Sequence, residues 1–216
     1  MKIYTLRHEH RYSNITSDTS LNQYGLKNAN SSLIEELNKL NIKTVYSSSF
    51  LRCLQTISPY LNNFKKFKKN VETTKTVNLY LPNQKSKPVL NIEYGFCEFL
   101  MPSYFNKDSE LKTSESYFDY YDLAKPNNKY RPIYSEEKLR SCIPETEVQM
   151  KNRVQYTLKT IIKNHKLNSN LKYKNILIVS HMSPIAAIWN YFDSSINYKD
   201  EFLDIKMGGI MEFNVE

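Results

Sequence analysis

The stretch KIYTLRHEHR, residues 2–11, decides the interpretation of this chain, because an apolar-leaning run there ends abruptly in arginine and histidine. Residues 3–6 are mostly β-branched, aromatic or aliphatic, which predicts a short buried strand. Arg7 and His8 follow at the point where that strand should stop. In open α/β sheets, ligands bind beyond the carboxyl ends of the strands. The position of this cationic pair therefore predicts a pocket for an anion.

Two later segments repeat the same transition from a strand to polar residues. Residues 43–46 form a strand-like run that is followed closely by Arg52, and residues 176–179 form an apolar run that ends in Ser180 and His181. An isolated Arg-His pair would carry little weight, since chance produces one in many chains. Three strand ends that each deliver a phosphate-binding type of side chain are more informative, because the planar fork of donors on arginine suits phosphate oxygens.

Helical patterns alternate with these strands. Apolar residues at three- and four-residue spacing predict one helix over residues 21–40, capped by Asp18, Thr19 or Ser20. A second helix should start at Ser48 or Ser49 and be kinked or shortened by Pro59. A third should begin with Pro144 and bury one apolar face. That face consists of Val148, Val154, Leu158, Ile161 and Ile162.

The alternation of strands and helices predicts an α/β layered fold, with further strands at residues 88–92 and 210–215. The length of 216 residues suits a single domain over residues 1–216. Two stretches interrupt the pattern. Residues 62–87, with one strand-like patch at 76–81, are expected to be a peripheral insertion. Residues 101–143 are either a lid that determines specificity or a solvated insertion, and the sequence leaves both open.

The composition, with 40% hydrophobic and 24% charged residues, indicates a soluble globular protein without a membrane segment. Three cysteines without CxxC spacing indicate reduced thiols, neither a disulfide framework nor a zinc site. The net charge of +8 comes from lysines scattered along the chain, which argues against a nucleic-acid partner. Because Arg7 lies so close to Met1, we expect no cleaved signal peptide and a cytoplasmic location.

Taken together, these residues resemble the histidine phosphatase superfamily, also called the phosphoglycerate mutase-like fold. The closest likeness is to the branch of ecdysteroid-phosphate phosphatases and the phosphatase domains of T-cell signalling suppressors. The resemblance implies a three-layer α/β/α architecture with a central, mostly parallel sheet. The matching positions are Arg7-His8 and Arg11; Asp18, Leu21, Gly25, Leu26 and Ala29; Ser48, Arg52, Gln55 and Thr56; Glu93, Gly95, Glu98 and Phe99; Tyr130, Arg131 and Pro132; and Ser180-His181.

The resemblance also implies roles for these side chains. His8 would be the nucleophile, Glu98 the proton donor, and His181 a catalytic residue that also binds phosphate. Arg7, Arg11 and Arg52 would complete the phosphate pocket. Three guanidinium groups should disfavour protonation of His8 and keep its lone pair available. The implied activity is hydrolysis of a phosphomonoester through a phosphohistidine, with no cofactor and no metal, on a phosphorylated small molecule or a phosphotyrosine-type substrate.

One departure from the superfamily pattern is Glu9, which stands where a glycine usually follows the nucleophile. A carboxylate there would repel phosphate unless it points away or pairs with an arginine, so activity could be weak. Three alternatives stay open: a phosphoglycerate-type mutase, a metallohydrolase that uses His8 and His10 with Glu98 and His181, and a non-catalytic module that binds a phosphorylated ligand. The sequence determines neither the natural substrate nor the oligomeric state, for which a homodimer is one option.

Overall fold

One five-stranded sheet forms the centre of the computed structural model, which describes residues 1–14, 16–73, 87–106, 109, 111–112, 114–168, 170–171, 174–199 and 204–215. The strand order is β3-β2-β4-β1-β5. β1 to β4 run parallel, and β5 joins the edge antiparallel to β1. The predicted edge strand at residues 210–215 is therefore confirmed. The strands are β1 (Lys2–Arg7), β2 (Ile42–Ser47), β3 (Val89–Ile92), β4 (Asn175–Ser180) and β5 (Ile210–Asn214).

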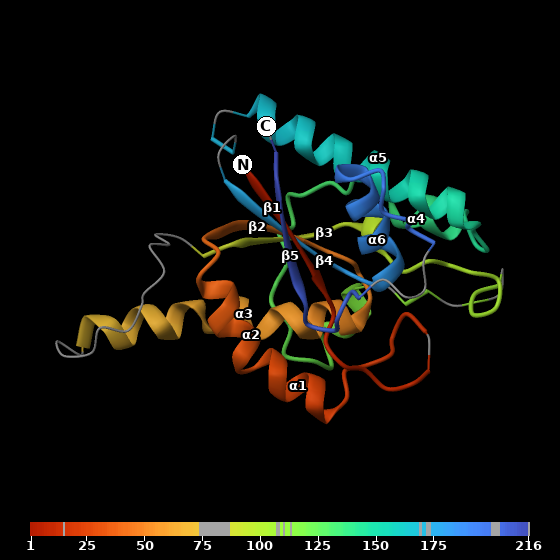
Figure 1. Ribbon diagram of the computed structural model, residues 1–216. Helices are drawn as coiled ribbons and strands as arrows, with labels where there is room; N and C mark the ends of the chain where they lie inside the picture. Colours follow the sequence, from red (N-terminus) through yellow and green to blue (C-terminus); the bar gives the residue numbers. More distant parts are fainter. Residues whose placement is uncertain are drawn as a thin grey trace.

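Helices cover both faces of the sheet (Figure 1). On one face lie α1 (Gln23–Ala29), α2 (Ser32–Asn38) and α3 (Leu51–Thr73), and on the other lie α5 (Glu147–Leu167) and α6 (Met182–Phe192). This arrangement confirms the three-layer α/β/α prediction. The shorter elements are the 3-10 turns η1 (Tyr94–Phe96) and η2 (Ser114–Tyr117) and the helix α4 (Glu136–Arg140).

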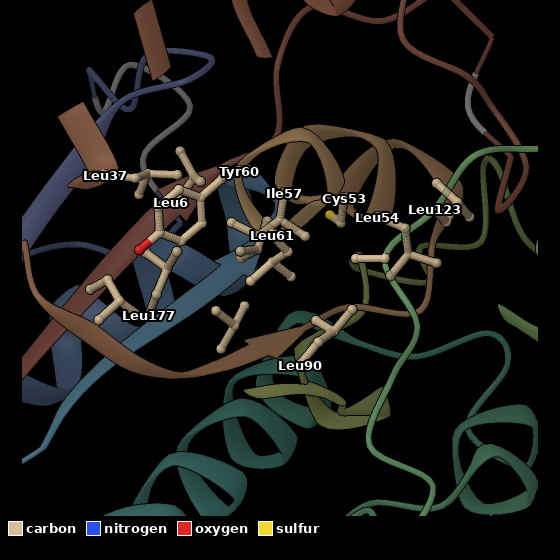
Figure 2. Packing of buried hydrophobic residues seen from close by; sticks show 14 of the residues in the cluster. Leu6, Leu37, Cys53, Leu54, Ile57, Tyr60, Leu61, Leu90, Leu123 and Leu177 are labelled. Carbon is tan, nitrogen blue, oxygen red and sulfur yellow. The ribbon is translucent and has the colours of Figure 1, made fainter. Parts of the chain in front are cut away.

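Two apolar cores separate these layers, because side chains alternate between the faces of each strand. In β4, Leu177 and Val179 face the α2–α3 layer, whereas Ile176 and Ile178 face α5 and α6. Figure 2 shows the first core, in which the α3 residues Ile57 and Leu61 pack over the sheet. Burial on both faces explains why the parallel strands read as continuous apolar runs.

The helix predicted over residues 21–40 is two helices, α1 and α2, so the prediction of one continuous helix was wrong. The polar side chains at the break take up helical carbonyls: Asn30 donates to Leu26 O at 2.8 Å and Ser31 to Lys27 O at 2.8 Å. Such bonds compete with the helical ladder and favour a break. The cap is also later than expected, two positions after Ser20, since Asn22 accepts from the Gly25 backbone at 2.9 Å.

Pro59 does not shorten the next helix, because α3 continues through it to Thr73. Ile57, Tyr60 and Leu61 are buried on both sides of the proline, and burial of three such side chains outweighs the cost of about 3 kcal/mol for a proline inside a helix.

The third predicted helix starts later than expected, at Glu147 with a Thr146 cap, so Pro144 precedes it. Val148 is exposed, which also corrects the predicted apolar face.

The interruption at residues 101–143 is anchored to the protein core. Its described part is irregular apart from η2 and α4, but Phe105, Leu111, Tyr117 and Leu139 are buried in the apolar clusters. In the interruption at residues 62–87, positions 62–73 continue α3, and the strand-like patch at 76–81 lies outside the described residues. Among the described helices, none is long and apolar enough to cross a bilayer.

Candidate active site

The three strand ends identified in the sequence lie beside one another in the sheet. β4 is flanked by β1 and β2, so the residues that follow these strands reach the same edge (Figure 1). Hydrogen bonds continue past the strand ends: the His8 backbone donates to Ser180 O at 2.9 Å, and the Ser48 backbone donates to Val179 O at 2.9 Å. One wall of the candidate site is therefore formed by the residue after β1, the loop before α3 and the start of α6.

His8 is buried, with 2% of its surface exposed. Its Nδ1 lies 2.7 Å from the carbonyl oxygen of Glu9. A carbonyl can only accept, so Nδ1 carries the hydrogen and the neutral ring keeps its lone pair on Nε2. Burial lowers the pKa of His8 well below 6.5, with further lowering by Arg52, Arg7 and Arg11. The expected influence of the arginines is present, but desolvation is the larger cause.

His181 is the N-cap residue of α6 and is completely buried. Its ring is 5.2 Å from the ring of His8, centroid to centroid. Nε2 lies 2.9 Å from the Ser48 hydroxyl, and Nδ1 lies 3.4 Å from Glu98 Oε2. Burial, and then the charge of Arg52, lower the pKa of His181 well below 6.5. Two neutral imidazoles therefore lie side by side at the end of β4.

Arg52 lies in the first turn of α3, as predicted, and is also completely buried. One amino group donates to Thr16 O at 2.8 Å, and the other lies 3.3 Å from Glu98 Oε2. The Phe50 ring lies beneath the guanidinium at 5.1 Å. Within the described residues, the buried Nε of Arg52 has no hydrogen-bond partner. A buried cationic donor of this kind is suited to an anionic oxygen.

Arg7 and Arg11 complete the cationic cluster. Arg7 donates to Ile205 O at 2.6 Å, and its buried Nε, like that of Arg52, has no partner in the described part of the chain. Arg11 donates to the backbone carbonyls of residues 12–14, which fixes the loop after β1. The pKa values of Arg7 and Arg11 are lowered, and desolvation is the largest cause. Repulsion from Arg52 lowers both values further, whereas the negative charge of Glu98 raises them.

Glu98 reaches this wall from the segment after η1. Its side chain is 17% exposed, and one ligand atom from each of His8, Glu98 and His181 lies within 4.8 Å of the others. Of the described residues, these three form the one group of histidine, cysteine and carboxylate side chains close enough to hold a metal ion. His10 is not part of it, because its ring packs edge-on against Tyr24 at 4.8 Å. The predicted His8-x-His10 metal clamp is therefore not formed.

Glu9 is buried away from this trio. A Cβ on Gly208 would lie 2.3 Å from Glu9 Oε1, so the carboxylate packs directly against that glycine, whose φ of +72° also favours glycine. The other oxygen, Oε2, accepts from the His10 backbone at 3.3 Å. Among the described residues, Glu9 forms no ion pair with an arginine. The Glu9 carboxylate is instead placed by the His10 backbone donor and by the turn at Gly208.

Glu93 has a structural environment. Its buried carboxylate accepts from the backbones of Gly95, Ile133 and Tyr134 and from the Tyr130 hydroxyl. Burial raises the pKa of Glu93, and these donors oppose the shift. The Glu93 carboxylate thus links η1 to residues 130–134 through these four hydrogen bonds.

Sequence reasoning missed one contributor to the site, the buried ion pair of Arg153 with Glu145. Glu145 was expected in the first turn of a helix, and Arg153 was not singled out. An arginine on the polar side of a helical pattern gives no signal of burial, because solvent exposure is the usual state of that residue type.

The chain matches one family model. It is that of the histidine phosphatase superfamily (branch 1), over residues 3–77. The match includes Arg7, His8, Arg11 and Arg52 and ends before Glu98 and His181, which the fold brings to the same place. The resemblance to the histidine phosphatases stated from the sequence is thereby confirmed. No protein of curated function matches the sequence.

Solved structures share the fold over almost the whole chain. The ecdysone phosphate phosphatase from Bombix mori, in complex with tungstate, has a TM-score of 0.65 and 13% identity over 99% of this chain and 89% of its own. The phosphoserine phosphatase from Entamoeba histolytica has a TM-score of 0.58 and 15% identity over 99% and 90%. The phosphoglycerate mutase from Bacillus anthracis has a TM-score of 0.58 and 16% identity over 98% and 86%. These similarities confirm the phosphoglycerate mutase-like fold.

Burial of the two neutral histidines predicts that acid destabilises the protein. Below about pH 6.5 the unfolded chain binds protons at His8 and His181, whereas the folded chain does not. The unfolded state then holds more protons, so the free energy of unfolding falls as the pH falls, by up to about 1.4 kcal/mol per pH unit for each histidine. Urea unfolding between about pH 7.5 and about pH 5.5 measures this slope. His181→Gln should flatten it, and a constant free energy in the unsubstituted protein would contradict the prediction.

Proposed function

We propose that this chain hydrolyses phosphomonoesters through a phosphohistidine formed on His8. The single observation that supports the proposal most strongly is the environment of His8. A buried imidazole with its hydrogen fixed on Nδ1 lies beside Glu98 and His181. The same cluster contains the Nε groups of Arg7 and Arg52, which have no hydrogen-bond partner among the described residues. A neutral nucleophile surrounded by fixed cations suits attack on a phosphate dianion.

Two steps account for the reaction. In the first, His8 Nε2 attacks phosphorus, the bond from phosphorus to the leaving oxygen breaks, and the Glu98 carboxyl transfers its proton to that oxygen. In the second, water attacks the phosphohistidine, Glu98 accepts a proton from the water, and the bond from phosphorus to nitrogen breaks. Inorganic phosphate is released, and His8 is regenerated.

Three cationic arginines and the neutral His181 stabilise both transition states. Arg7, Arg11 and Arg52, together with His181, donate to the equatorial phosphate oxygens, where charge is spread during transfer. Arg52 also contacts Glu98. A bound phosphate competes with Glu98 for that guanidinium.

The substrate class that fits best is a phosphorylated small molecule. The known proteins with this fold include phosphatases for ecdysone phosphate and phosphoserine. A phosphoglycerate mutase shares the fold as well, but a mutase needs a second cationic subsite. Both arginines at residues 101–143 are held elsewhere: Arg131 donates to Asn128 O and Tyr130 O, and Arg140 pairs with Glu136. This arrangement favours net hydrolysis.

Replacement of the nucleophile tests the proposal directly. His8→Ala should lower phosphate release from p-nitrophenyl phosphate on the order of 10³-fold or more, because no other group supplies the covalent route. It should also abolish the acid-labile phosphate that rapid quenching traps on the protein. His10→Ala is the matched control and should retain both signals. Phosphate trapped on His8→Ala at the level of the unsubstituted protein would contradict the assignment of His8 as nucleophile.

The trio of His8, Glu98 and His181 also has the spacing of a metal site, so metal dependence requires its own test. Three neighbouring guanidinium groups oppose a bound divalent cation. We therefore expect excess EDTA to change the rate by less than about twofold and tungstate, an analogue of phosphate, to inhibit. Loss of activity on chelation, restored by added zinc, would favour the metallohydrolase alternative.

The buried charge of Glu9 bears on the third alternative, a module that binds phosphate without catalysis. Glu9→Gln keeps the shape against Gly208 and the acceptor for the His10 backbone but removes the charge. If the carboxylate repels the substrate, KM should fall between about twofold and about tenfold, with kcat nearly unchanged. Steady-state kinetics with p-nitrophenyl phosphate measures this. An unchanged KM would show that the charge is screened from the pocket.

A further inference from the structure

A buried ion pair on the side of α5 contacts the chain segment that carries Glu98, residues 95–100. Arg153 lies inside α5, and Glu145 lies just before that helix. Both side chains are almost completely buried, at 3% and 1% exposed. Arg153 Nε donates to Glu145 Oε2 at 3.1 Å, and Arg153 Nη2 makes a second contact with Glu145 Oε1. The pair is bidentate, which fixes the plane of the guanidinium.

The remaining donors of Arg153 hold the backbone on the N-terminal side of the segment and at Glu98 itself. Nη1 donates to Gly95 O at 2.9 Å and to Cys97 O at 3.1 Å. Nη2 donates to Glu98 O at 3.1 Å. One guanidinium therefore fixes three carbonyl groups within four residues.

Glu145 holds the same segment on the C-terminal side. Its Oε1 accepts from the Leu100 backbone at 3.1 Å, and its own backbone N–H donates to Leu100 O at 3.0 Å. At the other end, Gly95 packs so closely on α5 that a Cβ there would lie 2.1 Å from Thr157 Oγ1. The backbone on both sides of Glu98 is thus attached to α5 and to Glu145, just before that helix.

We infer that Arg153, with Glu145, is a positioning residue for the proton donor Glu98. The inference rests on the proposed function of Glu98. Within the described part of the chain, the Glu98 carboxylate contacts the side chains of Arg52 and His181 and accepts from the Phe99 backbone, all within the candidate site or next to Glu98 itself. Its placement relative to His8 therefore depends on where its backbone is held. A displacement of about 1 Å at a reacting group can cost about 10²-fold in rate.

Leaving-group dependence separates positioning of an acid from general stability. Phenolate needs a proton as it leaves, whereas p-nitrophenolate is a weaker base and leaves with little help. Arg153→Lys keeps the charge beside Glu145 but cannot bridge three carbonyls. We expect kcat on phenyl phosphate to fall about 10- to 100-fold and kcat on p-nitrophenyl phosphate to fall no more than about threefold. In a Glu98→Gln background, Arg153→Lys should add little, because both changes remove the same function.

Arg140→Lys is the matched control, since Arg140 also pairs with a glutamate but lies on the partly exposed helix α4; it should leave both rates unchanged. An equal loss on both esters, or no loss, would overturn the inference and leave the proposed function intact. If the unsubstituted protein hydrolyses neither ester, the proposed function fails and the inference fails with it.

Circular dichroism and thermal unfolding show whether the variants fold. If Arg153→Lys does not fold, the double variant E145Q/R153M, which leaves no unpaired buried charge, is tested by the same criteria. Failure of both variants to fold would show that the pair is needed for stability alone and would overturn the inference.

Discussion

The pairing of β4 with both β1 and β2 is the constraint on which the candidate site depends. Val179 is opposite Leu6 in one strand pair and opposite Ser47 in the other. Three strand ends therefore stop at one level, and the residues after them meet. A slip of one residue in either pair would send alternate side chains to the opposite face of the sheet. The apolar cores, one on each face of the sheet, prevent such a slip. Packing far from the site therefore fixes the geometry of the site.

Charge is distributed unevenly in this wall. The arginines are cationic, whereas burial keeps both imidazoles neutral, so the cluster carries positive charge around two neutral histidines. Cys53 lies 3.5 Å from His181 Nε2 and could compete as a nucleophile. However, burial raises the pKa of its thiol, and a protonated thiol is a poor nucleophile. Of these two groups, His8 therefore suits the proposed nucleophilic role better.

Three glutamates near the site differ in what surrounds them. Glu93 is saturated by four donors, and Glu145 is paired with Arg153 and with the Leu100 backbone. Glu98 is partly exposed and contacts the side chains of Arg52 and His181. The carboxylates of Glu93 and Glu145 hold backbone segments in place, whereas that of Glu98 lies among the side chains of the candidate site, as its proposed role requires.

The sequence by itself determined the strands and the residues at their ends. Continuous apolar runs followed by Arg7-His8, Arg52 and Ser180-His181 require no knowledge of long-range contacts, because buried parallel strands are encoded locally. The helix predictions failed at two places, one for a local and one for a non-local reason. The break between α1 and α2 depends on side chains of Asn30 and Ser31 that capture carbonyls, and the passage of α3 through Pro59 depends on burial against the sheet. Only the tertiary structure decided that Glu9 packs on Gly208 and that Arg153 holds the Glu98 segment. Each of these contacts joins residues more than fifty positions apart, and no local pattern specifies which distant backbone a buried charge will meet.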